Sequence, residues 1–114
     1  MTMQQALEQL ARRWPTAHGD DEALPLVLQA ENIARAEVLG QQPLTEAPGG
    51  ELSIPAPYDM AYVHFAAALL AQMDGMYDRY NAELALYNGL YETWARAHRR
   101  ENLPPRGAEV VAYG

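Results

Sequence analysis

The chain has 114 residues, a length that fits one domain able to bury a core without disulfides or metal. The absence of cysteine excludes disulfide frameworks, thiol nucleophiles and thiolate metal sites, and it fits a reducing compartment. Fifteen acidic residues against eight arginines and no lysine give a net charge of −7, which argues against a nucleic-acid binder that neutralises phosphates.

A first helix is predicted over residues 2–13. Thr2 and Gln5 have the capping-box spacing, in which two side chains satisfy free N–H groups at a helix start. Its apolar positions repeat every three or four residues, at Met3, Leu7, Leu10 and Trp14. Pro15 ends the helix. We expect Trp14 to lie in the core, the alternative being an exposed anchor residue.

A second helix is predicted over residues 22–39. The acidic run at residues 20–22 is typical of a helix N-terminus, where acids offset the helix dipole, whereas a calcium site needs several more spaced oxygen ligands. Pro25 suits a first turn, so the regular helix is expected to begin near it. The buried side is expected to comprise Val27, Ala30, Ile33, Ala34 and Val38. Gly40 supplies the stop.

Residues 41–57 interrupt the helical pattern, because they contain four prolines and two glycines. Within them, residues 52–54 alternate between apolar and polar and predict a short extended piece. A loop of this length in a compact domain is usually functional or disordered. We therefore interpret residues 41–57 as a candidate contact segment, with disorder as the alternative.

Two further helices, residues 58–74 and 76–101, are predicted to form an antiparallel hairpin around Gly75. Residues 58–74 are apolar on most faces, so this helix is expected to be the central and most buried one. Asp59 is expected in its first turn. A single helix kinked at Gly75 is the alternative.

The last helix carries a stripe of large apolar residues. Their positions are Tyr77, Tyr80, Leu84, Tyr87, Tyr91 and Trp94. Steps of three and four residues place them on one side of a helix. At ~1.5 Å per residue the helix is ~39 Å long, so it spans the domain or projects from it. We interpret the stripe as half-buried, partly core and partly subunit contact.

Together these elements predict an all-α, four-helix bundle-like domain over residues 1–103, followed by an extended C-terminal tail over residues 104–114. The tail alternates weakly between apolar and polar residues and would be unstable alone as a strand. A neighbouring subunit or a partner could bind it by adding it to the edge of a sheet.

The sequence offers little catalytic chemistry. His64 and His98 could bind a metal together with Asp59 or Glu92, but no metal-binding spacing of histidines and acids is present, so packing roles are expected. Ser53, the only serine, lacks a nucleophile-elbow context, and no glycine-rich phosphate loop occurs. We predict no catalytic residue, no metal and no cofactor, and hence a protein that is not an enzyme.

Two segments carry a resemblance to a known family. Residues 52–59, LSIPAPYD, precede an apolar helix, and residues 75–81, GMYDRYN, open a helix rich in tyrosine and tryptophan that ends in arginines and a proline-containing tail. This pattern resembles the head–tail connector (adaptor) proteins of tailed phages. The resemblance covers roughly the second half of the chain, whereas residues 1–40 match only in their two-helix layout.

The resemblance implies a structural virion protein. Such connectors are small helical bundles that form a ring under the portal protein, expected here to be dodecameric in the virion. The ring extends the DNA channel, through which DNA passes without sequence-specific binding, and it offers a docking surface to a tail or neck protein. The expected location is the virion neck, and the host cytoplasm during assembly. The acidic balance suits a channel that must not hold DNA.

The predicted partner interface comes from the last helix and the tail. Its residues are Tyr87, Tyr91, Arg96, Arg99, Arg100, Pro104, Pro105, Val110, Val111 and Tyr113. The arginines either complement the negative end of the helix dipole or meet an acidic partner. No membrane partner is expected, because the longest apolar run, residues 61–73, is too short for a membrane span and no signal peptide pattern precedes it.

Two alternative functions stay open. One is a small acidic helical binding or inhibitor module that acts on a basic protein partner and binds it most strongly at low salt. The other is a small helical metalloenzyme that uses His64 and His98.

Overall fold

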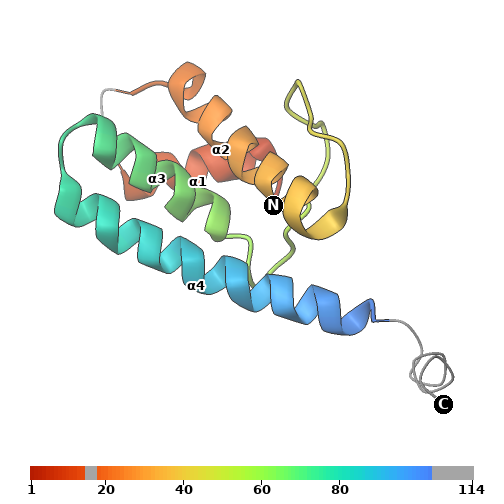
Figure 1. The fold of residues 1–114 in the computed structure, drawn as a ribbon. Coiled ribbons are helices and arrows are strands. Elements are labelled where there is room, and N and C mark those ends of the chain that lie inside the picture. Colours follow the sequence, from red (N-terminus) through yellow and green to blue (C-terminus); the bar gives the residue numbers. More distant parts are fainter. Residues whose placement is uncertain (15–17, 104–114) are drawn as a thin grey trace, which may run out of the picture.

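The computed structural model describes residues 1–14 and 18–103, and this part of the chain is helical. The helices are α1 (Met3–Arg13), α2 (Asp20–Ala34), the π-helical turn η1 (Arg35–Leu39), α3 (Ala61–Met73) and α4 (Tyr77–Glu101). Helix α3 packs against α1, α2 and α4, and Figure 1 shows it between α4 on one side and α1 and α2 on the other. The predicted all-α class is confirmed. No helix in the described ranges is long and apolar enough to cross a membrane.

Helix α1 begins as its sequence predicts. The Thr2 hydroxyl accepts a hydrogen bond from the Gln5 backbone N–H at 3.1 Å, and the Gln5 side chain accepts one from the Thr2 backbone N–H at 2.8 Å. This reciprocal pair is the predicted capping box. Trp14 is buried, which confirms its prediction as a core residue.

Helix α2 begins earlier than predicted. It starts at Asp20, so Pro25 lies inside the helix and does not mark its beginning. The three acids at residues 20–22 occupy the first turn, where they offset the helix dipole, and Pro25 follows in the next turn, where it cannot donate one backbone hydrogen bond. The chain ends its helical path at Gly40, whose φ of 63° is left-handed, which confirms the predicted stop.

The loop over residues 41–57 is not helical, as predicted, but it is not a free contact segment along its whole length. Leu52 and Ile54 are buried in the core. The predicted extended piece at residues 52–54 forms no strand, and the only pairing of the loop within the described residues is an isolated bridge between Thr2 and Glu51. Burial of its two apolar side chains against the helices determines the path of this segment.

A buried carboxylate holds this part of the loop in place. Glu31 on α2 is 2% exposed and accepts hydrogen bonds from the Ser53 backbone N–H at 3.0 Å, from the Ser53 hydroxyl and from the Tyr62 hydroxyl at 2.6 Å. The Tyr62 hydroxyl accepts in turn from the Ile54 backbone N–H at 2.8 Å. Burial, and then the bond to Glu31, raise the pKa of Tyr62 far above its usual value. The network therefore joins α2, α3 and the loop.

Helix α3 starts at Ala61, three residues later than predicted. Residues 58–60 form turns, in which the Ala61 N–H donates to the Tyr58 carbonyl at 3.0 Å. Asp59 therefore lies before the helix and not in its first turn, and its carboxylate accepts from the Met1 amino group at 3.4 Å. Ten of the thirteen residues of α3 are buried, which confirms that it is the central helix.

Helices α3 and α4 form the predicted antiparallel hairpin. Gly75 adopts a left-handed φ of 72°, and the Met76 N–H donates to the Ala71 carbonyl at 2.9 Å, so the chain turns back here. The alternative of one helix kinked at Gly75 is wrong. Helix α4 runs along the bundle and continues past the start of α3 (Figure 1). The predicted tail, residues 104–114, lies outside the described residues.

The predicted aromatic stripe of α4 is buried or half-buried except at its first position. Tyr87 and Trp94 are buried, whereas Tyr80, Leu84 and Tyr91 are half-buried. Tyr77 departs from the prediction, since it is 64% exposed. It is the first residue of α4 and lies at the hairpin turn, beyond the end of α3, where no neighbouring helix can cover it.

Candidate partner-binding site

The C-terminal end of α4 carries an exposed basic cluster, which consists of Arg96, Arg99 and Arg100. Within the described residues, none of these arginines forms an ion pair with a carboxylate. The helix end is capped by Asn102, whose side chain donates to the His98 carbonyl at 2.8 Å and whose backbone N–H donates to the same carbonyl at 3.1 Å. The cluster is therefore a positive surface on an acidic protein, with guanidinium groups available to a partner.

A groove runs beside this basic cluster, between α4 and η1. It has a volume of about 480 Å³ and is lined by Glu37, Tyr91, Glu92, Ala95, Arg96 and Arg99. The Tyr91 hydroxyl donates to the Glu37 carboxylate at 2.6 Å, and burial together with this bond raises the pKa of Tyr91. The groove thus sets guanidinium groups beside two carboxylates, an arrangement suited to a polar peptide surface and not to a small apolar ligand.

The structure brings together some of the predicted interface residues and separates others. Tyr91, Arg96 and Arg99 line the same groove, and Arg100 is exposed at the same helix end. Tyr87 is only 6% exposed, because it packs against Phe65 with ring centroids 5.0 Å apart, and burial raises its pKa to about 12. Tyr87 is therefore a core residue. Pro104, Pro105, Val110, Val111 and Tyr113 lie outside the described residues.

A second hollow lies where the loop passes beneath the end of α4. It has a volume of about 390 Å³, and its lining comprises Leu39, Ser53, Pro55, Ala56, Pro57, Tyr58, Trp94, Ala97, His98 and Glu101. Ser53 and residues 55–57 of the predicted contact segment thus reach the surface next to the basic cluster, whereas Ile54 between them is buried. The rings of Trp94 and His98, one helical turn apart, lie 5.8 Å apart along this side of α4.

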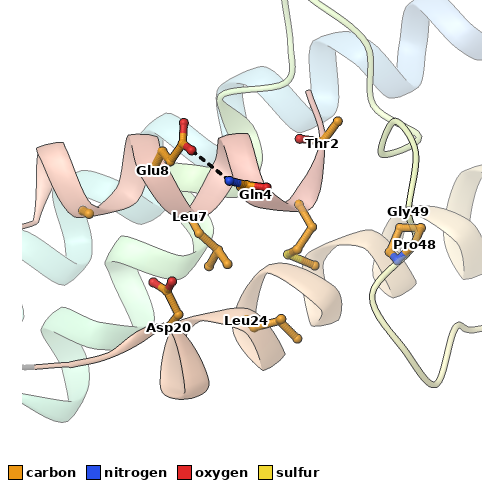
Figure 2. A pocket seen from close by; sticks show the side chains of 10 residues that line it. Thr2, Gln4, Leu7, Glu8, Asp20, Leu24, Pro48 and Gly49 are labelled. Atoms are coloured by element: carbon orange, nitrogen blue, oxygen red, sulfur yellow. Dashed lines mark hydrogen bonds between the residues drawn. The ribbon is translucent and has the colours of Figure 1, made fainter.

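A third groove, which the sequence did not indicate, lies between α1 and α2 (Figure 2). It has a volume of about 610 Å³ and is lined by Thr2, Met3, Gln4, Leu7, Glu8, Ala11, Asp20, Leu24, Pro48 and Gly49. Its apolar side chains include Leu7 and Leu24, and its carboxylates are Glu8 and Asp20. Gln4 donates to Glu8 at 3.3 Å. Neither carboxylate forms an ion pair with a described residue, so the groove is acidic. We call it the α1–α2 groove.

The two histidines of the metalloenzyme alternative are not brought together. His64 Nδ1 lies 2.8 Å from a carboxylate oxygen of Glu83, which Arg13 also binds. His98 is fifteen residues further along α4 than Glu83, a distance of ~22 Å at ~1.5 Å per residue. In the described part of the chain, no group of three histidine, cysteine, aspartate or glutamate residues could hold a metal ion.

His18 links the start of α2 to the hairpin end of α3. Its Nε2 lies 2.8 Å from Asp74 Oδ1, and its Nδ1 contacts the Glu22 carboxylate. Hydrogen bonds to Asp74, and then to Glu22, raise the pKa of His18 above 6.5. Because the folded pKa is raised, the contribution of His18 to stability is present below the unfolded pKa and is lost as pH rises through the folded pKa.

We therefore expect His18→Gln to lower the midpoint of urea unfolding more at about pH 5.5 than at about pH 8.5. Urea titrations of the wild type and the variant at the two pH values measure this difference. The Asp74→Asn variant removes the carboxylate charge that His18 Nε2 contacts. The stability of this variant should therefore depend less on pH than the stability of the wild type does. An equal effect of His18→Gln at both pH values would show that the charged form of His18 does not stabilise the fold.

Comparisons with protein-family models, with curated proteins and with solved structures found no match for this chain. The basic cluster of α4, the two hollows beside it and the α1–α2 groove are therefore the basis for assigning a function.

Proposed function

We propose that this chain is a structural subunit of a tailed-phage head–tail connector, which assembles as a ring under the portal, extends the DNA channel and offers a docking surface to the tail. The observation that carries the proposal is the basic cluster at the free end of α4. Three exposed arginines without a described carboxylate partner, on a chain of net charge −7, form a surface suited to binding another protein.

The shape of the helical domain supports a role in assembly. Helix α4 runs along the bundle and continues beyond the start of α3 (Figure 1), so its end can reach a neighbouring molecule while the rest of the helix stays packed on α3. The two hollows flank this end, one beside η1 and one beside the loop. A partner that binds here therefore contacts guanidinium groups, carboxylates and the edges of aromatic rings. Such a combination of charged and polar contacts contributes more to the specificity of binding than to its affinity.

The excess of acidic residues supports a position in which the chain lies beside DNA but does not bind it. A surface of negative charge repels phosphates, so DNA can move past the ring without adhering. The three consecutive acids at the start of α2 add to this field, since residues 20–22 are exposed.

The experiment that tests the proposal is co-sedimentation with the portal protein encoded in the same genome. We expect the chain to sediment with that portal in a fixed ratio and not with the portal of an unrelated phage, which serves as the control. Absence of the chain from the portal fraction, at low and at moderate salt, would contradict the connector role.

A second candidate function, an acidic module that binds a basic protein, is favoured by the α1–α2 groove. Its two unpaired carboxylates beside apolar side chains suit a lysine or arginine side chain, whose stem is apolar and whose head is charged. A chain that stays monomeric and ignores the portal, yet binds a basic peptide through Glu8 and Asp20 at low salt, would support this function in place of the connector role.

A further inference from the structure

We infer that copies of this chain join head to tail, with Arg96 and Arg100 of one copy entering the α1–α2 groove of the next copy. The inference rests on the proposed function and deepens it, because it names the contact between ring subunits. It is argued from the charges, exposure and placement of two surfaces that a single molecule leaves unpaired.

The donating surface lies on the last turns of α4, where Arg96 also lines the groove beside η1. Arg96 and Arg100 are four residues apart, so they lie one above the other on the same helix face. Both are exposed, and neither has a carboxylate partner among the described residues. Arginine carries a planar fork of N–H donors that binds carboxylates with two parallel hydrogen bonds, so this pair suits an acidic cleft.

The accepting surface is the α1–α2 groove. Its volume of about 610 Å³ lies within the range of pockets that enclose small ligands, which is ample for arginine side chains. Figure 2 shows Glu8 on α1 and Asp20 at the start of α2 at the same end of the groove, on its two opposite walls, with Leu7 between them and the Glu8 carboxylate turned toward Gln4. An arginine stem can therefore pack on Leu7 and Leu24 while its guanidinium group meets the carboxylates.

The two surfaces cannot satisfy each other within one molecule. Helix α3 lies between α4 and the pair formed by α1 and α2 (Figure 1), and the ion pair that joins α1 to α4, between Arg13 and Glu83, lies thirteen residues before Arg96 along α4. Two different surfaces can join copies head to tail, and repetition of this heterologous contact produces a closed ring when the rotation between subunits closes. The placement of these charges therefore agrees with ring assembly.

Two variants and two matched controls test this contact. Arg96→Gln with Arg100→Gln removes the donating charges, and its control, Asn81→Asp with Asn88→Asp, makes the same net charge change at exposed positions of the same helix. Glu8→Gln with Asp20→Asn removes the accepting charges. Its control, Glu46→Gln with Asp21→Asn, changes an exposed loop acid and the neighbouring acid of the same first turn, neither of which lines the groove. Circular dichroism verifies that all four variants fold.

Sedimentation velocity without the portal, over a range of protein concentrations, gives the readout. We expect the wild type to self-associate, more strongly at low than at high salt, and each test variant to associate roughly tenfold more weakly. Both controls should associate like the wild type. A wild type that is monomeric at every concentration, or controls that weaken association as much as the test variants do, would overturn the inference.

Mixing the two test variants distinguishes a head-to-tail contact from any other contact. The arginine variant keeps an intact groove, and the groove variant keeps its two arginines. The arginines of the second can therefore enter the groove of the first, but no further chain can be added through this contact. We expect a complex that stops at two chains under conditions where the wild type forms larger assemblies. Growth of the mixture to wild-type size, or no complex at all, would contradict this contact.

The same variants distinguish this inference from the proposed function. If both test variants assemble on the portal like the wild type, the connector role stands and the head-to-tail contact through these residues is wrong. If the wild type self-associates as described but ignores the portal, the contact stands and the connector role is wrong.

Discussion

Replacing Glu31 with alanine should lower the free energy of unfolding by about 3–5 kcal/mol, which is among the largest effects expected in this chain. Glu31 is buried and accepts three hydrogen bonds, two from Ser53 and one from Tyr62. Its removal leaves the buried Tyr62 hydroxyl and the half-buried N–H and hydroxyl groups of Ser53 without this acceptor, and each buried unsatisfied group costs about 1–3 kcal/mol. Urea unfolding at neutral pH measures the change.

The Glu31→Ala substitution should also favour local opening of the loop around residues 53–54, without unfolding of the helices. The N–H groups of Ser53 and Ile54 bind to Glu31 and to Tyr62, so hydrogen exchange at these two amides should accelerate. Glu46→Ala, at an exposed position of the same loop, is the control and should change stability by less than about 0.5 kcal/mol. Unchanged exchange at Ser53 and Ile54 in the Glu31→Ala variant would show that the network does not hold the loop.

Replacing Glu83 with alanine should cost about 2–4 kcal/mol at neutral pH. Glu83 is 3% exposed and accepts from Arg13 Nε at 2.8 Å and 3.0 Å, and it lies 2.8 Å from His64 Nδ1. Loss of the carboxylate leaves the buried His64 ring and the exposed Arg13 guanidinium group without this partner. Chemical unfolding of both proteins at pH 7 measures the change.

The contribution of Glu83 should also depend on pH. Burial alone would raise the pKa of Glu83, but hydrogen bonds from Arg13 and His64 together hold it below its ordinary value of 4.5. Since the folded pKa is lowered, the stabilisation is present above the unfolded pKa and is lost as pH falls through the folded pKa. The difference in stability between the wild type and the isosteric control Glu83→Gln should therefore shrink on acidification below about pH 4. A difference that stays constant well below that pH would argue against a charged Glu83 in the fold.

Local signals allowed most helix ends to be predicted from the sequence. The capping pair of Thr2 and Gln5, and the left-handed glycines Gly40 and Gly75, act within a few residues, so their effect is visible in the sequence. The prediction was wrong at the start of α2, where two local signals, Pro25 and the acidic run at residues 20–22, favour different first turns. Pro25 lies inside α2, because the acids at residues 20–22 already form the first turn of the helix.

The buried polar networks could not be predicted from periodicity. Glu31 and Tyr62 are thirty-one positions apart, and Arg13 and Glu83 are seventy apart, so neither pair leaves a local pattern. Both acids lie among the apolar positions of their helices, Glu31 between Val27 and Ala34 and Glu83 between Tyr80 and Tyr87, but the repeat does not identify the groups that pair with them. Only the tertiary arrangement, in which α3 carries His64 and Tyr62 into the centre, shows why these carboxylates are buried.

The candidate site was partly visible in the sequence. The basic cluster at Arg96, Arg99 and Arg100 stands out because three of the eight arginines of an acidic chain fall within five residues. The α1–α2 groove was missed, since its lining comes from three separate segments, residues 2–11, residues 20–24 and residues 48–49. Hydrophobic periodicity indicates which face of a helix is buried, but it does not show where two helices leave a hollow between them.

The measurement that tests the connector role most directly is mass photometry of the cognate portal assembly with and without this chain. The connector role predicts a single discrete gain in mass that corresponds to a closed ring with a fixed number of copies. This gain should not increase further when more chain is added. No gain in mass, or a gain that grows without limit as chain is added, would contradict a ring that caps the portal.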